Sequence, residues 1–233
     1  MDVAIPIVFP DYLIAVNTPP VTLQMPHIGH GLDFFPNVVR IPGTNNRLPE
    51  LGHAGILIIN GANGLTKYYE YGRYDRANLG LTRRVPVRDV VLAASPPRRP
   101  TSRSLAQTLH LISATAGQRG RISGAYIEVP PGKFHAMLVY CQKRVRENSD
   151  PHREPYSLTG HSCIHFAQEV LEAGDVDVPW MIDPRPIGYM DRLQSDFPAL
   201  NYEVRTNSLA IEGLELPESA IGPARHAMPT GRR

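Results

Sequence analysis

The chain has 233 residues, 42% hydrophobic and 20% charged, a composition typical of one globular domain of ordinary size, or of one domain with an extension. The formal net charge is only +2, from 24 basic and 22 acidic residues, so no strongly basic surface for nucleic acid or an anionic membrane is indicated. No stretch reaches the roughly 18 to 20 apolar residues of a membrane span. We therefore expect neither a nucleic-acid partner nor a membrane span.

The N-terminus and the cysteine content bear on localisation. The chain begins with Met1 and Asp2 and has no basic region before its apolar residues, so the sequence predicts no secretory signal peptide. Its two cysteines do not make a disulfide framework. We expect the protein to be made in the cytoplasm, while export by a route that needs no signal peptide stays open.

Proline punctuates the first 50 residues, which excludes a helix of useful length there. The sequence predicts short extended pieces at residues 4–9, 12–16 and 38–41, in a strand-and-loop segment that wraps the core. Residues 54–59 then form a nearly continuous apolar run, which is typical of a strand buried on both faces.

A hairpin follows from that buried strand. Residues 60–64 (NGANG) supply turn residues, and the aromatic-rich residues 67–71 return as the second strand. A third strand is predicted through residues 85–92. Further on, a short helix near residues 190–195 and a strand around residues 202–204 are expected.

Amphipathic spacing predicts two helices in the middle of the chain, around residues 105–112 and 134–145. The first is expected to begin after Thr101 or Ser102, both good N-cap residues. The second carries Cys141 on its apolar stripe, where a thiol behaves as a small hydrophobic group. We interpret Cys141 as a buried core residue.

Cys163 is predicted to start a third strong helix, which ends before Gly174. A thiol at a helix N-terminus is favoured as the thiolate, and the free backbone N–H groups of the first turn can stabilise an oxyanion. The alternative is a core thiol on an amphipathic helix. A thiolate nucleophile also needs a base, and His53, at the start of the buried strand between small neighbours, is the candidate.

Glu70 is the candidate for the group that orients His53. If Ile59 pairs with Thr66 across the hairpin, Gly55 lies opposite Glu70, and Glu70 shares the face of His53 one diagonal step away. A register slip of one residue would bring a tyrosine of the same strand there instead. The candidate catalytic residues are therefore Cys163, His53 and Glu70.

Four segments resemble the permuted branch of the NlpC-type papain-like superfamily: residues 51–56 (LGHAGI), 67–74 (KYYEYGRY), 156–158 (YSL) and 162–167 (SCIHFA). In that branch the strand histidine precedes the cysteine helix. The sequence YEYGRY at residues 69–74 is also similar to type VI secretion toxins that carry such a domain. The lecithin:retinol acyltransferase family belongs to the same branch, although its members often have Asn where this chain has Ser162.

The resemblance implies an α+β, circularly permuted papain-like fold, with an antiparallel sheet packed on helices. The resemblance covers roughly residues 50–175, and with the rest of the sequence it leads us to expect a wrapping segment at residues 1–50, the catalytic domain at 51–220 and a tail at 221–233. The implied activity is a cysteine amidase or peptidase that needs no cofactor or metal and cleaves peptidoglycan or another amide substrate through a thioester. In the toxin setting, the implied site of action is the periplasm of a target bacterium, and a cognate immunity protein is an expected partner.

Three alternatives stay open from the sequence. The same thioester chemistry could serve an acyltransferase or lipid hydrolase. The domain could be a binding module without turnover. A metal could bind at His161 and His165, whose i, i+4 spacing suits one helix face, or at His27 and His30.

Overall fold

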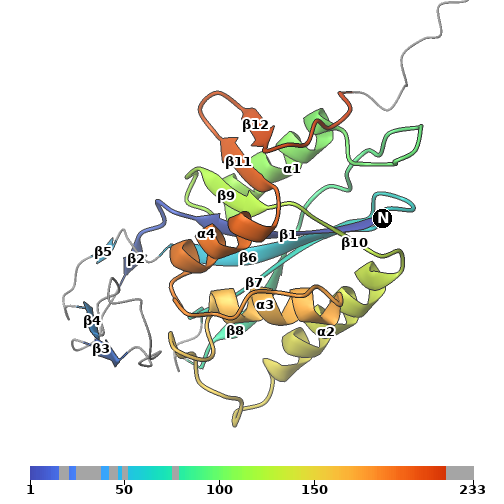
Figure 1. Cartoon of the computed structure of the whole chain (residues 1–233). Coiled ribbons are helices and arrows are strands. Elements are labelled where there is room, and N and C mark those ends of the chain that lie inside the picture. The colour runs from blue at the N-terminus through green and yellow to red at the C-terminus, as the bar shows by residue number, and fades with distance from the viewer. Residues whose placement is uncertain (16–20, 25–37, 42–46, 49–51, 75–78, 219–233) are drawn as a thin grey trace, which may run out of the picture.

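The computed structural model describes residues 1–15, 21–24, 38–41, 47–48, 52–74 and 79–218 (Figure 1). The strands are β1 (Asp2–Phe9), β2 (Ile14–Ala15), β3 (Val21–Gln24), β4 (Val38–Ile41), β5 (Arg47–Leu48), β6 (His53–Ile59), β7 (Thr66–Gly72), β8 (Leu81–Val85), β9 (Ile122–Ala125), β10 (Ile127–Val129), β11 (Ala199–Glu203) and β12 (Ser208–Ile211). The helices are α1 (Ser102–Thr115), α2 (Lys133–Glu147), α3 (Cys163–Ala173) and α4 (Pro186–Asp196).

Eight strands form one antiparallel sheet in the order β12-β11-β9-β1-β6-β7-β8, with β10 also paired to β1. Strands β1 and β6 lie side by side at its centre (Figure 1), in register from Val3 opposite Ile59 to Phe9 opposite His53. The expected α+β class, with an antiparallel sheet packed on helices, is confirmed. The extended piece predicted at residues 4–9 is a central strand of this sheet.

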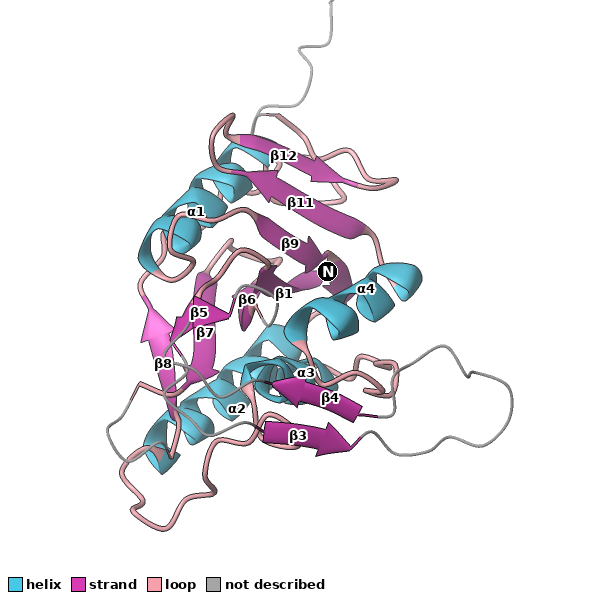
Figure 2. Cartoon of the chain, turned by 90° about the vertical axis from the view of Figure 1, so that its left-hand side faces the viewer, coloured by secondary structure: helices cyan, strands magenta, loops and turns pink. Residues whose placement is uncertain are grey.

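Helices cover both faces of the sheet and create two cores. Helix α1 packs on one face, and α2, α3 and α4 pack on the other, so that β9 and β11 run between α1 and α4 in Figure 2. Strand β6 contributes to both cores because alternate side chains point to opposite faces: Ile56 and Ile58 pack with α3, and Leu57 and Ile59 pack with α1. The predicted burial of this strand on both faces is confirmed.

Helices α1, α2 and α3 begin close to where the sequence predicts, whereas α4 begins at Pro186, before the predicted residues 190–195. Thr101 is the N-cap of α1, and its hydroxyl accepts a hydrogen bond from the Ser104 N–H. Cys141 lies on α2 with none of its surface exposed, as expected. Cys163 is the first residue of α3. No helix in the described part of the chain is long and apolar enough to cross a membrane.

The third strand of the hairpin lies elsewhere than predicted. The sequence places it through residues 85–92, but β8 ends at Val85. The next residue, Pro86, has no N–H to donate to a sheet and disfavours continuation of a strand. The shift matters for the site because Arg83, which the prediction left outside the sheet, lies on β8 directly opposite Glu70.

Candidate active site

Cys163 occupies the N-terminal end of α3, and only 2% of its surface is exposed. Its N-cap, Ser162, has an extended backbone (φ −120°, ψ −179°), and its side chain does not cap the backbone N–H groups of the helix. The Ser162 hydroxyl instead contacts His165 Nδ1 at 2.8 Å. The first backbone N–H groups of α3 have no acceptor within the helix itself, and they surround the sulfur with partial positive charge.

His53 is the first residue of β6, so its ring lies at the end of the sheet. Gly52, which precedes it, has a left-handed backbone (φ +67°) that turns the chain into the strand. The imidazole ring lies 6.2 Å from the ring of Phe9 and 5.0 Å from that of Tyr12, between centroids. These aromatic neighbours restrict the ring, and 6% of the His53 surface is exposed.

The His53 ring has partners on Glu70, Tyr74 and Cys163. Nε2 lies 3.1 Å from Glu70 Oε2 and 2.9 Å from the Tyr74 hydroxyl. The Cys163 thiol lies close enough to the ring for each group to shift the pKa of the other. The structure therefore brings together two predicted residues that are 110 positions apart in the sequence.

Glu70 is fully buried and lies on the same side of the hairpin as His53. The predicted register is confirmed, with Ile59 opposite Thr66 and Gly55 opposite Glu70. Four side chains satisfy the carboxylate: His53 at 3.1 Å, Tyr74 at 2.9 Å, Tyr68 at 3.4 Å and the Arg83 guanidinium. A buried carboxylate with this many donors is held as the anion.

Two residues of this arrangement had no role in the sequence-based prediction. The guanidinium of Arg83 binds Glu70 and lies 4.0 Å from the centroid of the Tyr74 ring. The Tyr74 hydroxyl contacts both His53 and Glu70. The available signal for Tyr74 was its place at the end of the aromatic-rich segment, whereas Arg83 could be found only with the correct bounds of β8.

Tyr156 is a further residue at the sulfur. Its hydroxyl donates to Cys163 Sγ at 3.7 Å, and its ring stacks on that of Tyr71, with centroids 5.5 Å apart and an interplanar angle of 19°. The Arg73 guanidinium lies 5.2 Å from the Tyr156 ring centroid. In the sequence, Tyr156 entered only as part of the YSL segment, with no role attached to it.

The electrostatics of the site favour a thiolate–imidazolium pair. Burial raises the pKa of Cys163, but hydrogen bonds and charge from His53, with smaller contributions from Tyr156 and the Ala54 N–H, outweigh burial and lower it. Burial likewise lowers the pKa of His53, yet Cys163 and Glu70 raise it to about 9. For Glu70, burial raises the pKa, and His53 and Arg83 bring it below its ordinary value.

The arrangement supplies the groups that nucleophilic catalysis needs. A thiolate is the reactive form of cysteine, a neighbouring imidazolium can give up a proton, and a buried carboxylate fixes the ring and stabilises its charge. Tyr156 and the N-terminus of α3 add hydrogen-bond donors beside the sulfur.

The structure gives no support to the metal alternative within its described residues, where no three His, Cys, Asp or Glu side chains are grouped to hold an ion. His161 Nε2 accepts from Arg144 at 2.9 Å, and His165 Nδ1 contacts Ser162, so the two rings are engaged separately. His27 and His30 lie outside the described residues.

The fold and site together define an α+β protein with an eight-stranded antiparallel sheet, four helices and a buried cysteine–histidine–glutamate cluster at the end of the central strand. Comparison with known proteins shows the family within this class. The family model described as "Type VI secretion system effector TseH-like" matches residues 4–177, and the chain belongs to that family.

A solved structure agrees with the family assignment. The crystal structure of the type VI secretion system effector TseH is similar to this chain with a TM-score of 0.69 and 31% sequence identity, covering 90% of this chain and 97% of that chain. No curated protein was found that matches the sequence. The resemblance to type VI secretion toxins is thus confirmed at the level of the family.

Proposed function

We propose that this effector is a cysteine hydrolase on a circularly permuted papain-like fold of the NlpC type, and that it cleaves amide bonds of peptidoglycan. The convergence of Cys163, His53 and Glu70 at the end of β6 is the observation that carries the proposal. The order of these groups along the chain supports the permuted arrangement, because the histidine strand precedes the cysteine helix. The proposed catalytic unit comprises residues 51–220 together with β1.

In the first half of the reaction, the Cys163 thiolate attacks the carbonyl carbon of the scissile amide. The carbonyl oxygen becomes an oxyanion, which backbone N–H groups at the N-terminus of α3 can stabilise. The C–N bond then breaks as the His53 imidazolium donates its proton to the departing nitrogen. The products of this half are a free amine, a thioester on Cys163 and a neutral imidazole.

In the second half, neutral His53 accepts a proton from water while that water attacks the thioester carbon. The C–S bond breaks, a carboxylic acid leaves, and the thiolate–imidazolium pair forms again. Glu70 stays ionised throughout and stabilises the imidazolium at the beginning and end of the cycle. Tyr74 and Arg83 hold the carboxylate in place.

The family gives the proposal its biological setting. A type VI secretion effector is delivered to target cells. We propose that this effector acts in the periplasm of the recipient, where peptidoglycan is accessible, and that the producing cell is protected by a cognate immunity protein.

The experiment is digestion of purified peptidoglycan followed by mass analysis of the released fragments. We expect the wild-type protein to release fragments whose masses identify one amide bond, while Cys163→Ala and His53→Ala release none. Cys141→Ala is the matched control, because this thiol is buried on α2 away from the site, and its fragments should equal those of wild type. Fragment release by Cys163→Ala equal to that of wild type would refute the proposed nucleophile.

A growth assay tests the setting separately. The wild-type protein, given an added periplasmic leader in a bacterial host, should lyse the cells, whereas the same protein confined to the cytoplasm should not. If the protein killed cells only when it was kept in the cytoplasm, a peptidoglycan substrate would be contradicted.

A further inference from the structure

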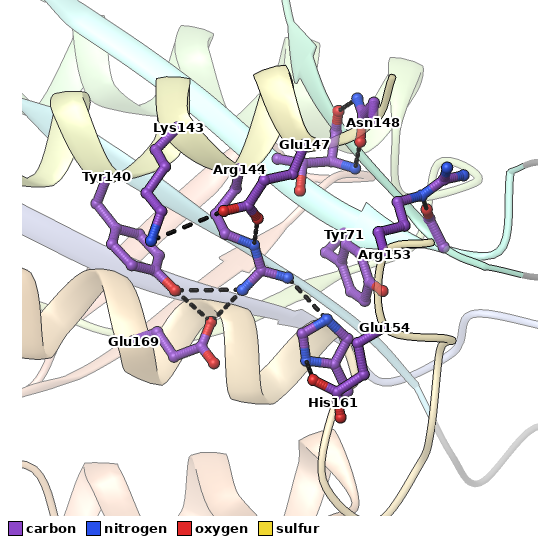
Figure 3. A network of polar contacts seen from close by, with 12 residues as sticks. Tyr71, Tyr140, Lys143, Arg144, Glu147, Asn148, Arg153, Glu154, His161 and Glu169 are labelled. Carbon is purple, nitrogen blue, oxygen red and sulfur yellow. Dashed lines mark hydrogen bonds and ion pairs between the residues drawn. The ribbon is translucent and has the colours of Figure 1, made fainter. Parts of the chain in front are cut away.

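A second polar cluster surrounds Arg144 on α2, a residue whose surface is only 7% exposed (Figure 3). Its Nη1 donates to the Tyr140 hydroxyl at 3.2 Å and to Glu169 Oε2 at 2.5 Å. Its Nε lies 3.0 Å from Glu147 Oε2, and its Nη2 lies 2.9 Å from His161 Nε2. One guanidinium thus connects α2, α3 and the loop that precedes Cys163.

The contact with Arg144 determines which nitrogen of the His161 ring accepts a hydrogen bond. A guanidinium has donors and no acceptor, so His161 Nε2 must accept, and the ring proton resides on Nδ1. Nδ1 faces Glu154 Oε2 at 3.6 Å. The ring also packs edge-on against Tyr71, with centroids 5.2 Å apart at 74°, and the Arg144 guanidinium lies 5.3 Å from the same Tyr71 ring centroid.

His161 also connects this cluster to the nucleophile. Its backbone pairs with Ser157, with N–H to carbonyl distances of 3.0 and 2.9 Å, which closes a turn over residues 157–161. Tyr156, directly before that turn, stacks on the same Tyr71 ring that His161 contacts and donates its hydroxyl to Cys163 Sγ. The placement of Tyr156 therefore depends on how His161 is held.

The start of the same loop is fastened to the edge of the sheet. The Asn148 side chain accepts from the Thr82 N–H at 2.9 Å and donates to the Thr82 carbonyl at 2.7 Å. The Arg153 Nε donates to the Gly80 carbonyl at 3.0 Å. These contacts hold the start of the loop beside β8, and the Arg144–His161 contact holds its end.

We propose that Arg144 and His161 are positioning residues that hold the Tyr156 hydroxyl on the sulfur of Cys163. A buried ion cluster is poor evidence for added stability, because desolvation of the charges offsets their attraction, and we therefore assign this cluster the role of fixing the geometry of the loop. The inference rests on the proposed role of Cys163 as nucleophile, and it states in addition that the loop before Cys163 influences the reactivity of the thiol.

The test uses the rate of Cys163 alkylation by iodoacetamide as a function of pH, followed by peptide mapping, so that no peptidoglycan is needed. His161→Phe keeps an aromatic ring against Tyr71 but removes the acceptor for Arg144. We expect it to slow alkylation roughly three- to tenfold at pH values where the thiol is partly protonated, with rates converging at high pH, since one hydrogen bond to the thiolate is lost. His161→Gln keeps an acceptor and should restore most of the rate.

A double-mutant cycle separates positioning from general loosening. Tyr156→Phe should reproduce the slowing, and the double variant His161→Phe/Tyr156→Phe should be no slower than Tyr156→Phe alone. Lys143→Met, which removes only an exposed partner of Glu147 on α2, is the control and should alkylate as wild type does. Arg144→Gln, provided that it folds, should slow Cys163 alkylation as much as His161→Phe does.

A pH profile of His161→Phe identical to that of wild type, or additive losses in the cycle, would overturn the positioning role while leaving Cys163 as nucleophile. Alkylation of wild-type Cys163 no faster than that of Cys141 would instead overturn the nucleophile itself, and this inference with it.

Discussion

At the residue scale, the candidate site is a row of alternating charges. The Cys163 thiolate, the His53 imidazolium, the Glu70 carboxylate and the Arg83 guanidinium follow one another through direct contacts. Their formal charges sum to zero, which makes ionisation of so buried a set tolerable. The Arg83 side chain is 41% exposed and places the last charge of the row at the surface.

The pH dependence of hydrolysis follows from this row. Below the lowered pKa of Cys163 the thiol is protonated, so activity should rise with pH on the acid side, at values below those of an ordinary thiol. Above about 9, the pKa of His53, the imidazolium that protonates the leaving nitrogen is lost, so activity should fall. Steady-state rates across the pH range measure both limbs. Activity that keeps rising well above pH 9 would contradict an imidazolium acid.

Replacement of Glu70 tests the third member of the site. Glu70→Gln keeps an acceptor for the ring but removes the charge that supports the imidazolium, so the rate should fall by about tenfold to a thousandfold, less than for Cys163→Ala or His53→Ala. The alkaline limb should also move to lower pH, because the pKa of His53 loses one of the interactions that raise it.

A matched control exists for this variant. Glu128, on β10 and away from the site, also pairs with an arginine: its Oε1 lies 2.7 Å from Arg99 Nε. Glu128→Gln should leave both the rate and the pH profile unchanged. If Glu70→Gln hydrolysed at the wild-type rate and kept the wild-type melting temperature, another group than Glu70 would have to orient His53.

At the element scale, β6, β7 and α3 place the site, and the sequence predicts most of this placement. The turn at residues 60–64 determines the register that sets Gly55 opposite Glu70. Small and polar residues before an apolar stripe locate the start of α3 at Cys163. Both signals are local in the chain, and local patterns of turn chemistry and periodicity carry over directly into structure.

The parts that the sequence did not predict depend on contacts between distant segments. Arg83 was missed because the third strand was predicted through residues 85–92, across Pro86, and its place opposite Glu70 is a pairing between two strands. Tyr156 lies in a loop whose conformation is set by stacking on Tyr71 and by Arg144, neither adjacent to it in the chain. Such placements follow from tertiary packing, which no pattern of neighbouring residues contains.

The entry into β6 gives an element-scale prediction. An Ala at Gly52 would have to keep φ near +67°, and its Cβ would lie 3.2 Å from the Phe9 carbonyl oxygen and 3.3 Å from Ile187 Cγ1. We expect Gly52→Ala to lower the free energy of unfolding by about 1–2 kcal/mol. We also expect it to lower the hydrolysis rate by more than the lost stability explains, because His53 directly follows the strained residue.

The control for Gly52→Ala is Gly132→Ala, at the N-cap of α2. Gly132 also has a left-handed backbone (φ +90°), but an added Cβ there meets nothing within 4 Å. This variant should lose a similar amount of stability in a thermal melt while keeping wild-type activity. Equal loss of activity in both variants would show that global stability, and not the placement of His53, is responsible.

At the scale of the whole molecule, the first strand joins the two halves of the sheet. Strand β1 pairs with β9 and β10 on one side and with β6 on the other, and all eight of its residues are buried. Residues 1–9 therefore belong to the structure that supports His53, although the cysteine, histidine and glutamate all lie after residue 50.

Removal of β1 tests this dependence. Without residues 2–9, the set β12-β11-β9 and the set β6-β7-β8 lose their shared backbone partner, and both cores lose apolar side chains, Val8 from one and Ile5 and Ile7 from the other. We expect the shortened chain to show no cooperative thermal transition by circular dichroism and no hydrolysis, since exposed strand edges and lost burial cannot be compensated locally. Removal of residues 221–233, which the sequence predicts to be a tail, controls for truncation and should leave the melt unchanged. A cooperative melt at the wild-type temperature without residues 2–9 would show that the unit at 51–220 folds without the first strand.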